Sequence, residues 1–224
     1  MILLGAACQV AVPAVSTPTV EATSTIQNTP ETTAPVETRP QREEVGVNGV
    51  QLGIEIPPGW DVQRTGDGLL IAEYFSTIES GTMPKGMQIH LFVHSMDGFK
   101  LPDSRDTNVA WAVLEQIVDK PEYIGNALVS APTGFDWDGH DAAYYLLNNN
   151  DGNLSVLVAV ALLSPKRLVV CNFSSPSPQA DGIRGMLPQI LSSLTINGVS
   201  MDITALHNLP DPLHFPEASA IEHP

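Results

Sequence analysis

The sequence predicts an α+β fold, in which an antiparallel sheet of about six or seven strands is flanked by two main helices. Three observations support this class. Most segments alternate apolar and polar residues, two segments instead have helical spacing, and turn signals join long strands as consecutive hairpins. The 224 residues include 43% hydrophobic ones, enough to bury a sizeable core. We expect this folded domain over residues 46–198.

The first half of the domain is predicted to be strands and turns. Apolar residues alternate over 52–56, and Pro57-Pro58-Gly59 ends that strand. A second strand begins at Trp60, and a hairpin at Asp67-Gly68 precedes residues 69–75. Residues 87–93 predict a further strand with one apolar face. Its other face carries Gln88, His90, Phe92 and His94.

A helix and then longer strands are predicted to follow. Apolar residues recur at helical spacing over 110–117, with Asp106 or Thr107 as the cap and Pro121 as the end. Residues 124–135 read as a strand. Three long strands then form hairpins, and a last helix begins at Ser177-Pro178. The long strands are 141–147, 154–163 and 167–173, and the last helix runs to Leu194 before Thr195-Ile196.

Residues 49–60, with the sequence GVQLGIEIPPGW, together with the order of the elements resemble the PsbP/Mog1-like superfamily. Residues 193–196, SLTI, resemble the closing element of that superfamily. The resemblance covers residues 46–198. It implies an α/β/α sandwich, often secreted or tethered to a membrane, that serves as an accessory or binding module.

The first eight residues, MILLGAAC, resemble the lipobox of bacterial lipoproteins. The resemblance implies cleavage after Ala7 and a lipid on Cys8. The segment departs from the lipobox pattern at Gly5, where a large aliphatic residue is usual, and it lacks a basic region before the apolar stub. An ordinary disordered terminus with an incidental cysteine is the alternative.

Two segments are predicted to lie outside the domain. Residues 9–45 are rich in Thr and Pro, contain five prolines and have no aromatic residue, so we expect a disordered linker. Such a chain is semi-extended and could hold a domain several nanometres from a membrane. Residues 199–224 contain four prolines and few periodic apolar residues, which predicts an irregular tail on the surface or in solvent.

Composition excludes several classes of protein. The net charge of −15 argues against nucleic-acid binding, and two cysteines are too few for a disulfide framework or a Cys-rich metal module. The longest apolar run, residues 154–163, is about half the ~20 residues that span a bilayer. No nucleophile elbow, phosphate loop or His-Glu-x-x-His motif is present. We expect a monomer without a cofactor.

Two histidines and a tryptophan are candidate contact residues. His90 and His94 lie four residues apart on a strand, hence ~13 Å apart, and cannot chelate one ion alone. With Gln88 they could line a shallow pocket beneath a loop. Trp137 lies in a turn between acidic residues, so we expect it to be exposed and available to a partner.

Asp136, Asp138 and Asp141 are candidate cation ligands. Oxygen ligands at spaced positions around the glycine turn at Gly139 suit Ca²⁺, although the bidentate Glu of an EF-hand loop is absent. The alternative is a plain hairpin whose Asp side chains bond to their own backbone.

The leading hypothesis is a non-enzymatic module, anchored through Cys8 outside the bacterial cytoplasmic membrane, that binds an envelope protein or a small ligand. Two alternatives come from other classes. One is a Ca²⁺-dependent adhesion or sensor domain. The other is a secreted hydrolase, which requires His90, His140 or Cys171 to converge with a carboxylate in a deep pocket.

Overall fold

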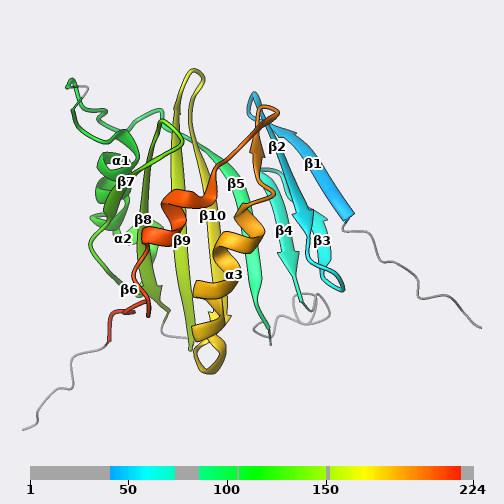
Figure 1. Ribbon diagram of the computed structural model, residues 1–224. Coiled ribbons are helices and arrows are strands. Elements are labelled where there is room, and N and C mark those ends of the chain that lie inside the picture. Colours follow the sequence, from blue (N-terminus) through cyan, green and yellow to red (C-terminus); the bar gives the residue numbers. More distant parts are fainter. Residues whose placement is uncertain (1–40, 74–85, 105, 150–151, 218–224) are drawn as a thin grey trace, which may run out of the picture. The chain divides into compact units, whose positions relative to one another are not determined.

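A computed structural model describes residues 41–73, 86–104, 106–149 and 152–217 (Figure 1). The lipobox-like segment with Cys8, and the linker before residue 41, lie outside these described residues. Within them, the strands form two antiparallel sheets. The smaller sheet has the order β1 (Gln41–Val47), β2 (Val50–Ile56), β11 (Thr195–Ile196), β12 (Val199–Ser200). The larger sheet has the order β3 (Asp61–Arg64), β4 (Gly68–Ala72), β5 (Gln88–Ser95), β10 (Lys166–Pro176), β9 (Asn153–Leu163), β8 (His140–Asn148), β6 (Leu128–Val129), and β7 (Thr133–Trp137) also pairs with β8.

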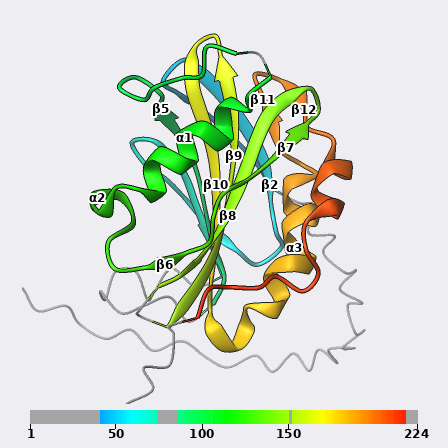
Figure 2. The same ribbon diagram turned by 90° about the vertical axis from the view of Figure 1, so that its left-hand side faces the viewer.

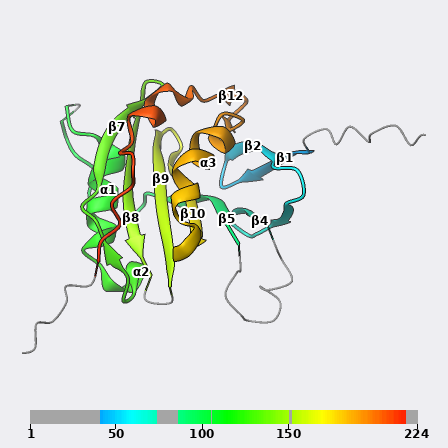
Figure 3. The same cartoon turned by 60° about the horizontal axis from the view of Figure 1, so that its bottom comes forward.

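Helices cover both faces of the larger sheet (Figures 2 and 3). On one face lies α1 (Val109–Val118), followed by the single turn α2 (Pro121–Ile124). On the other lie α3 (Asp181–Leu191), which follows the 3₁₀ turn η2 (Ser177–Gln179), and the 3₁₀ helix η3 (Ile203–Asn208). The predicted α+β class, with an antiparallel sheet between two main helices, is confirmed. We refer below to the α1 face and the α3 face.

The alternation within the strands produces two hydrophobic cores. The larger core lies on the α3 face and includes Ile89, Leu91 and Phe173 from the larger sheet, with Leu52 and Ile54 from the smaller one. The smaller core lies on the α1 face, where the helix packs against β8, β9 and β10. The predicted split of residues 87–93 is confirmed, because its odd-numbered positions are buried and Gln88, His90, Phe92 and His94 are half-buried.

The folded region begins earlier than residue 46, since β1 occupies Gln41–Val47. The predicted linker boundary at residue 45 is therefore wrong. Asn48 and Gly49 have φ of 51° and 81°, the left-handed geometry that a two-residue hairpin requires, and they pair β1 with β2. The Asn-Gly signal was in the sequence. The polar, mostly exposed side chains of β1 concealed the strand.

The C-terminal segment is also packed, which corrects the prediction of a tail on the surface or in solvent for its described part. Met201, Leu206 and Leu209 are buried in the larger core, and Leu206 is 0% exposed. Arg184 of α3 donates to the carbonyls of His207, Leu209 and Pro210 at 3.1–3.2 Å. A few apolar residues separated by prolines give no periodic signal, so the sequence pattern does not reveal this packing.

Local corrections concern the elements around α1. Its cap is Asn108, whose side chain accepts from Trp111 N at 2.8 Å, rather than Asp106 or Thr107. The expected single strand over 124–135 is divided between β6 and β7. The turn predicted at Asp138-Gly139 is confirmed, with φ of 55° and 76°.

Candidate functional site

Side chains on the α1 face change character along the strands. In β10 they run from Leu168 and Val170 to Asn172 and Ser174. The neighbouring strand β9 changes in the same direction, because its register places Ser155 opposite Ser174. The α1 helix packs on the aliphatic half, together with Ala159 and Ala161. The polar half lies toward α2.

This polar half forms a hollow of about 350 Å³ on the α1 face. Its volume lies at the small end of the usual range for small-molecule sites, roughly 300–1,000 Å³. Among the described residues that line it, none is charged. Four are amides, four carry hydroxyl groups and three are aliphatic: Gln88, Asn149, Asn153, Asn172; Tyr123, Tyr145, Ser155, Ser174; Ile124, Leu147, Leu157.

A short hydrogen-bond chain orders one side of the hollow. The amide of Asn149 donates to Ser155 Oγ at 3.2 Å, and the hydroxyls of Ser155 and Ser174 are 2.8 Å apart. Either hydroxyl can be the donor in that pair. The serine pair can therefore reverse its direction and present either a donor or an acceptor, while Asn149 stays the donor to Ser155.

Two polar atoms beside the hollow lack a hydrogen-bond partner within the described part of the chain. They are Asn172 Oδ1 and His90 Nε2, both buried, on residues that are register partners across β10 and β5. His90 Nε2 does have an ion-pair partner, because it lies 3.4 Å from Asp67 Oδ1, and His90 is not among the residues that line the hollow. A buried polar atom without a partner carries a free-energy cost, so such atoms often mark functional positions.

Two ionisable groups at this site are perturbed. Burial raises the pKa of Tyr145 to about 12, so its hydroxyl stays protonated and able to donate even in mildly alkaline solution. Burial also acts to raise the pKa of Asp67. The hydrogen bond from Thr65 Oγ1 at 2.7 Å and the nearby His90 outweigh it, and the pKa of Asp67 lies below its usual value.

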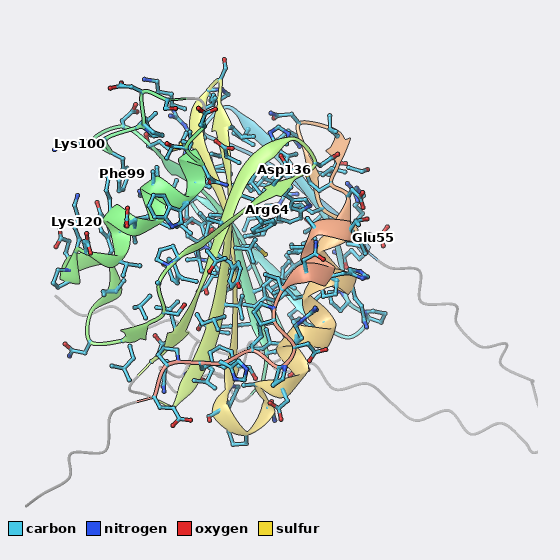
Figure 4. The ribbon with its side chains drawn as sticks, turned by 60° about the vertical axis from the view of Figure 1, so that its left-hand side comes forward. Glu55, Arg64, Phe99, Lys100, Lys120 and Asp136 are labelled. Carbon is cyan, nitrogen blue, oxygen red and sulfur yellow. The ribbon has the colours of Figure 1, made fainter. Side chains whose placement is uncertain are left out.

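An aromatic cluster forms one rim of the hollow. The ring of Tyr123, 50% exposed, lies 6.3 Å from Phe99 and 6.5 Å from His94. Lys120 Nζ lies 5.3 Å and 5.5 Å from the centres of the Phe99 and Tyr123 rings, within cation–π range. Figure 4 shows Phe99 and Lys120 beside α1, on the side of the molecule away from Glu55.

The structure places the predicted contact residues differently. His90 and His94 both lie near the hollow, and Gln88 lines it. Their role in contacting a ligand remains a prediction. Trp137 is 1% exposed and belongs to the larger core, where its Nε1 donates to Asp202 O at 2.6 Å. The expectation that Trp137 is exposed is wrong, because the C-terminal segment covers it.

The acidic candidates have structural partners. Asp136 Oδ1 accepts from Gly139 N at 3.1 Å, which closes the turn, and Asp141 Oδ2 accepts from Val109 N at 2.9 Å, at the start of α1. Asp138 is exposed in the turn. In the described parts of the chain no group of three His, Cys, Asp or Glu residues could hold a metal ion. The structure therefore gives the Ca²⁺ alternative no support.

The three residues of the hydrolase alternative lie at separate places, so the structure assembles no single site from them. His90 Nε2 lies 3.4 Å from the carboxylate of Asp67, outside the lining of the hollow on the α1 face, and the hydrolase alternative stays a prediction. Cys171 is buried in the core of the α3 face, where burial raises the pKa of its thiol, whereas His90 lies on the α1 face. His140 borders a different hollow with Gly139 and Asp141 at the β7–β8 turn.

Sequence reasoning missed Asn172, Ser155, Ser174 and Tyr145. A signal did exist. Alternate positions of β9 and β10 turn polar at the ends of the two strands that are far from the short hairpin between residues 163 and 166, and this hairpin sets the register that places those ends opposite each other. Ser155 is the one polar residue near the start of the apolar run 154–163, so the run as a whole hides it.

The fold and the hollow define a class: an α+β domain with a polar recess on one sheet face. No protein-family model and no curated protein matches the chain. Among solved structures it is similar to cyanobacterial PsbP from Synechocystis sp. PCC 6803, with 12% identity, a TM-score of 0.45, and 75% of this chain and 99% of that chain covered. It is also similar to the Ran-binding protein Mog1p of Saccharomyces cerevisiae, with 12% identity, a TM-score of 0.42, and 72% and 97% covered.

Proposed function

We propose that this protein is a non-enzymatic binding module, held outside the bacterial cytoplasmic membrane by a lipid on Cys8, that binds through the hollow on the α1 face. The observation that carries the binding role is the uncharged polar lining together with the buried Asn172 Oδ1, which has no hydrogen-bond partner among the described residues. A ligand can supply hydrogen bonds there that the described residues do not.

The anchoring part of the proposal rests on the N-terminal sequence. The lipobox-like MILLGAAC and the Thr/Pro-rich stretch after it suit a domain held at a distance from a membrane. No helix in the parts of the chain that the structure describes has the length and apolar character to cross a bilayer. Stable attachment through Cys8 would depend on more than one acyl chain, since a single chain binds only marginally.

Binding is tested by photo-crosslinking in the bacterial envelope. Benzoylphenylalanine in place of Tyr123, at the rim of the hollow, should give a discrete adduct. The same group in place of Val199, which is 60% exposed in β12 of the smaller sheet, is the control and should not. Equal adducts at both positions, or none at Tyr123, would remove the hollow as the binding site.

Anchoring is tested separately by intact mass and fractionation of the protein expressed behind a full secretion leader. We expect a mature chain that starts at Cys8 and is heavier by its lipid. Cys8→Ser should move the protein out of the membrane fraction. Retention of Cys8→Ser in the membranes would contradict the anchor and leave the binding role intact.

A further inference from the structure

We propose that the hollow on the α1 face takes a neutral, polyhydroxylated ligand, that is, a carbohydrate. This inference rests on the proposed binding function and names the class of ligand.

The charge of the lining selects the class. The chain has a net charge of −15, yet none of the eleven described residues that line the hollow is charged. A cationic ligand would find no carboxylate in the lining, and an anionic ligand would find no cation there, because Lys120 at the rim is not a lining residue and its Nζ lies over the Phe99 and Tyr123 rings. Desolvating a charged ligand without a counter-charge is costly, so this lining favours an uncharged one.

The hydrogen-bonding groups narrow the class further. Amide side chains offer donors and acceptors together, as the hydroxyls of Tyr145, Ser155 and Ser174 also do. Sugar hydroxyls likewise donate and accept at once. The reversible Ser155–Ser174 pair can adjust to either need. An alkyl ligand would leave these groups desolvated and unpaired, which argues against a lipid chain.

Two further features suit a sugar ring. Tyr123 presents a half-exposed aromatic ring at the rim, a flat surface for the apolar face of a pyranose. Asn172 Oδ1 is buried without a partner among the described residues. The broad terminal torsion of asparagine lets that amide turn toward the hollow, where a ligand hydroxyl can donate to it.

The volume sets the size of the ligand. A hollow of about 350 Å³ suits a small molecule rather than a folded partner. We therefore expect one or two sugar units to be held, with dissociation constants in the micromolar to millimolar range.

The test is ligand-observed NMR and calorimetry on the full chain with glucose, galactose, N-acetylglucosamine and their β-1,4-linked disaccharides. Glucuronate, choline and a capped alanine tripeptide serve as charged and peptide controls. Neutral saccharides should bind, and the controls should bind about tenfold more weakly or not at all. Tighter binding of a charged control or of the tripeptide overturns the inference.

Variants locate the binding. Asn172→Leu and Tyr145→Phe should each weaken saccharide binding by about tenfold or more. The matched control is Gln189→Leu, an amide replaced on the α3 side, which should leave it unchanged. If Gln189→Leu has the same effect as Asn172→Leu, the saccharide does not occupy this hollow.

Failure here is distinguishable from failure of the proposed function. If no saccharide of the panel binds while the Tyr123 crosslink still forms, the ligand class is wrong and the binding module stands. If neither signal is seen, both proposals fall.

Discussion

The two faces of the larger sheet differ in how completely they are closed, although the same strands supply both. On the α3 face, α3, the smaller sheet and the C-terminal segment bury a continuous apolar core. Arg184 and Trp137 bond that segment through its backbone carbonyls. On the α1 face, the helix covers the aliphatic half and leaves a polar hollow, where Asn172 Oδ1 is buried without a hydrogen-bond partner among the described residues. The α3 face is thus organised for stability, and the α1 face keeps a buried polar atom that stability alone does not explain.

The largest expected effect is a loss of stability, seen when one tryptophan from each face is replaced by alanine. Trp137→Ala should lower the free energy of unfolding by about 3–5 kcal/mol, because it opens a cavity and leaves Asp202 O without its donor. Trp111→Ala should cost roughly half as much. Trp111 is half-buried, and its Nε1 bonds to Pro132 O at a longer 3.2 Å. Urea denaturation measures both, and equal losses would contradict the difference between the faces.

The next largest effect is a difference in stability between variants of two asparagines on the α1 face. Asn108 donates to Phe135 O and Ala142 O and accepts from Trp111 N, so Asn108→Leu should cost about 2–3 kcal/mol. Asn172→Leu removes an acceptor with no partner among the described residues and should leave stability unchanged or raise it by up to about 1 kcal/mol. A large loss for Asn172→Leu in thermal and urea unfolding would show that Asn172 serves the fold rather than a ligand.

A smaller loss of stability is expected where the side chain of Arg184 bonds to the C-terminal segment. Arg184→Ala removes the donors to three carbonyls and should cost about 1–2 kcal/mol, because the guanidinium is half-exposed. Amide hydrogen exchange should rise over residues 201–209. Arg64→Ala is the control, since its exposed ion pair with Glu43 at 3.2 Å should contribute less than about 0.5 kcal/mol. Unchanged exchange in Arg184→Ala would mean that apolar burial alone holds the segment.

The smallest effect is a pH dependence on the α1 face. The folded pKa of Tyr145, about 12, lies above its ordinary value of 10.0. The contribution of this residue to stability is therefore fully present below pH 10 and is lost as the pH rises from 10 toward 12. By pH 11 the loss should be about 1.4 kcal/mol.

Tyr145→Phe isolates this contribution, because the variant cannot titrate at residue 145. The difference in unfolding free energy between the two proteins, measured by urea at pH 9 and pH 11, separates Tyr145 from the buried Cys171. The pKa of that thiol is also raised, so it too loses stability in alkali. A fall of the same size in Tyr145→Phe would show that Tyr145 is not the source.

The sequence determined the larger sheet more fully than it determined the ends of the domain or the hollow. Period-two patterns such as residues 87–93 are local and survive folding unchanged. Trp137 was misjudged because its cover comes from residue 202, distant in sequence. The hollow depends on four strands and α2 meeting at one end of the sheet, a consequence of register that no single segment carries. Polar residues inside a strand show their meaning only when the neighbouring strand is known.

The first strand has a mechanical consequence if Cys8 is fixed to a membrane. Tension on the chain reaches the domain at Gln41, which pairs with Ile56 at the open end of the β1–β2 hairpin. Yielding should therefore begin at that pair and proceed toward Asn48-Gly49. The side chains of β1 are mostly exposed, so release of this strand removes few packing contacts from the core around Leu52 and Ile54. Release of the seven residues of β1 would lengthen the tether by about 2 nm before the α1 face is strained.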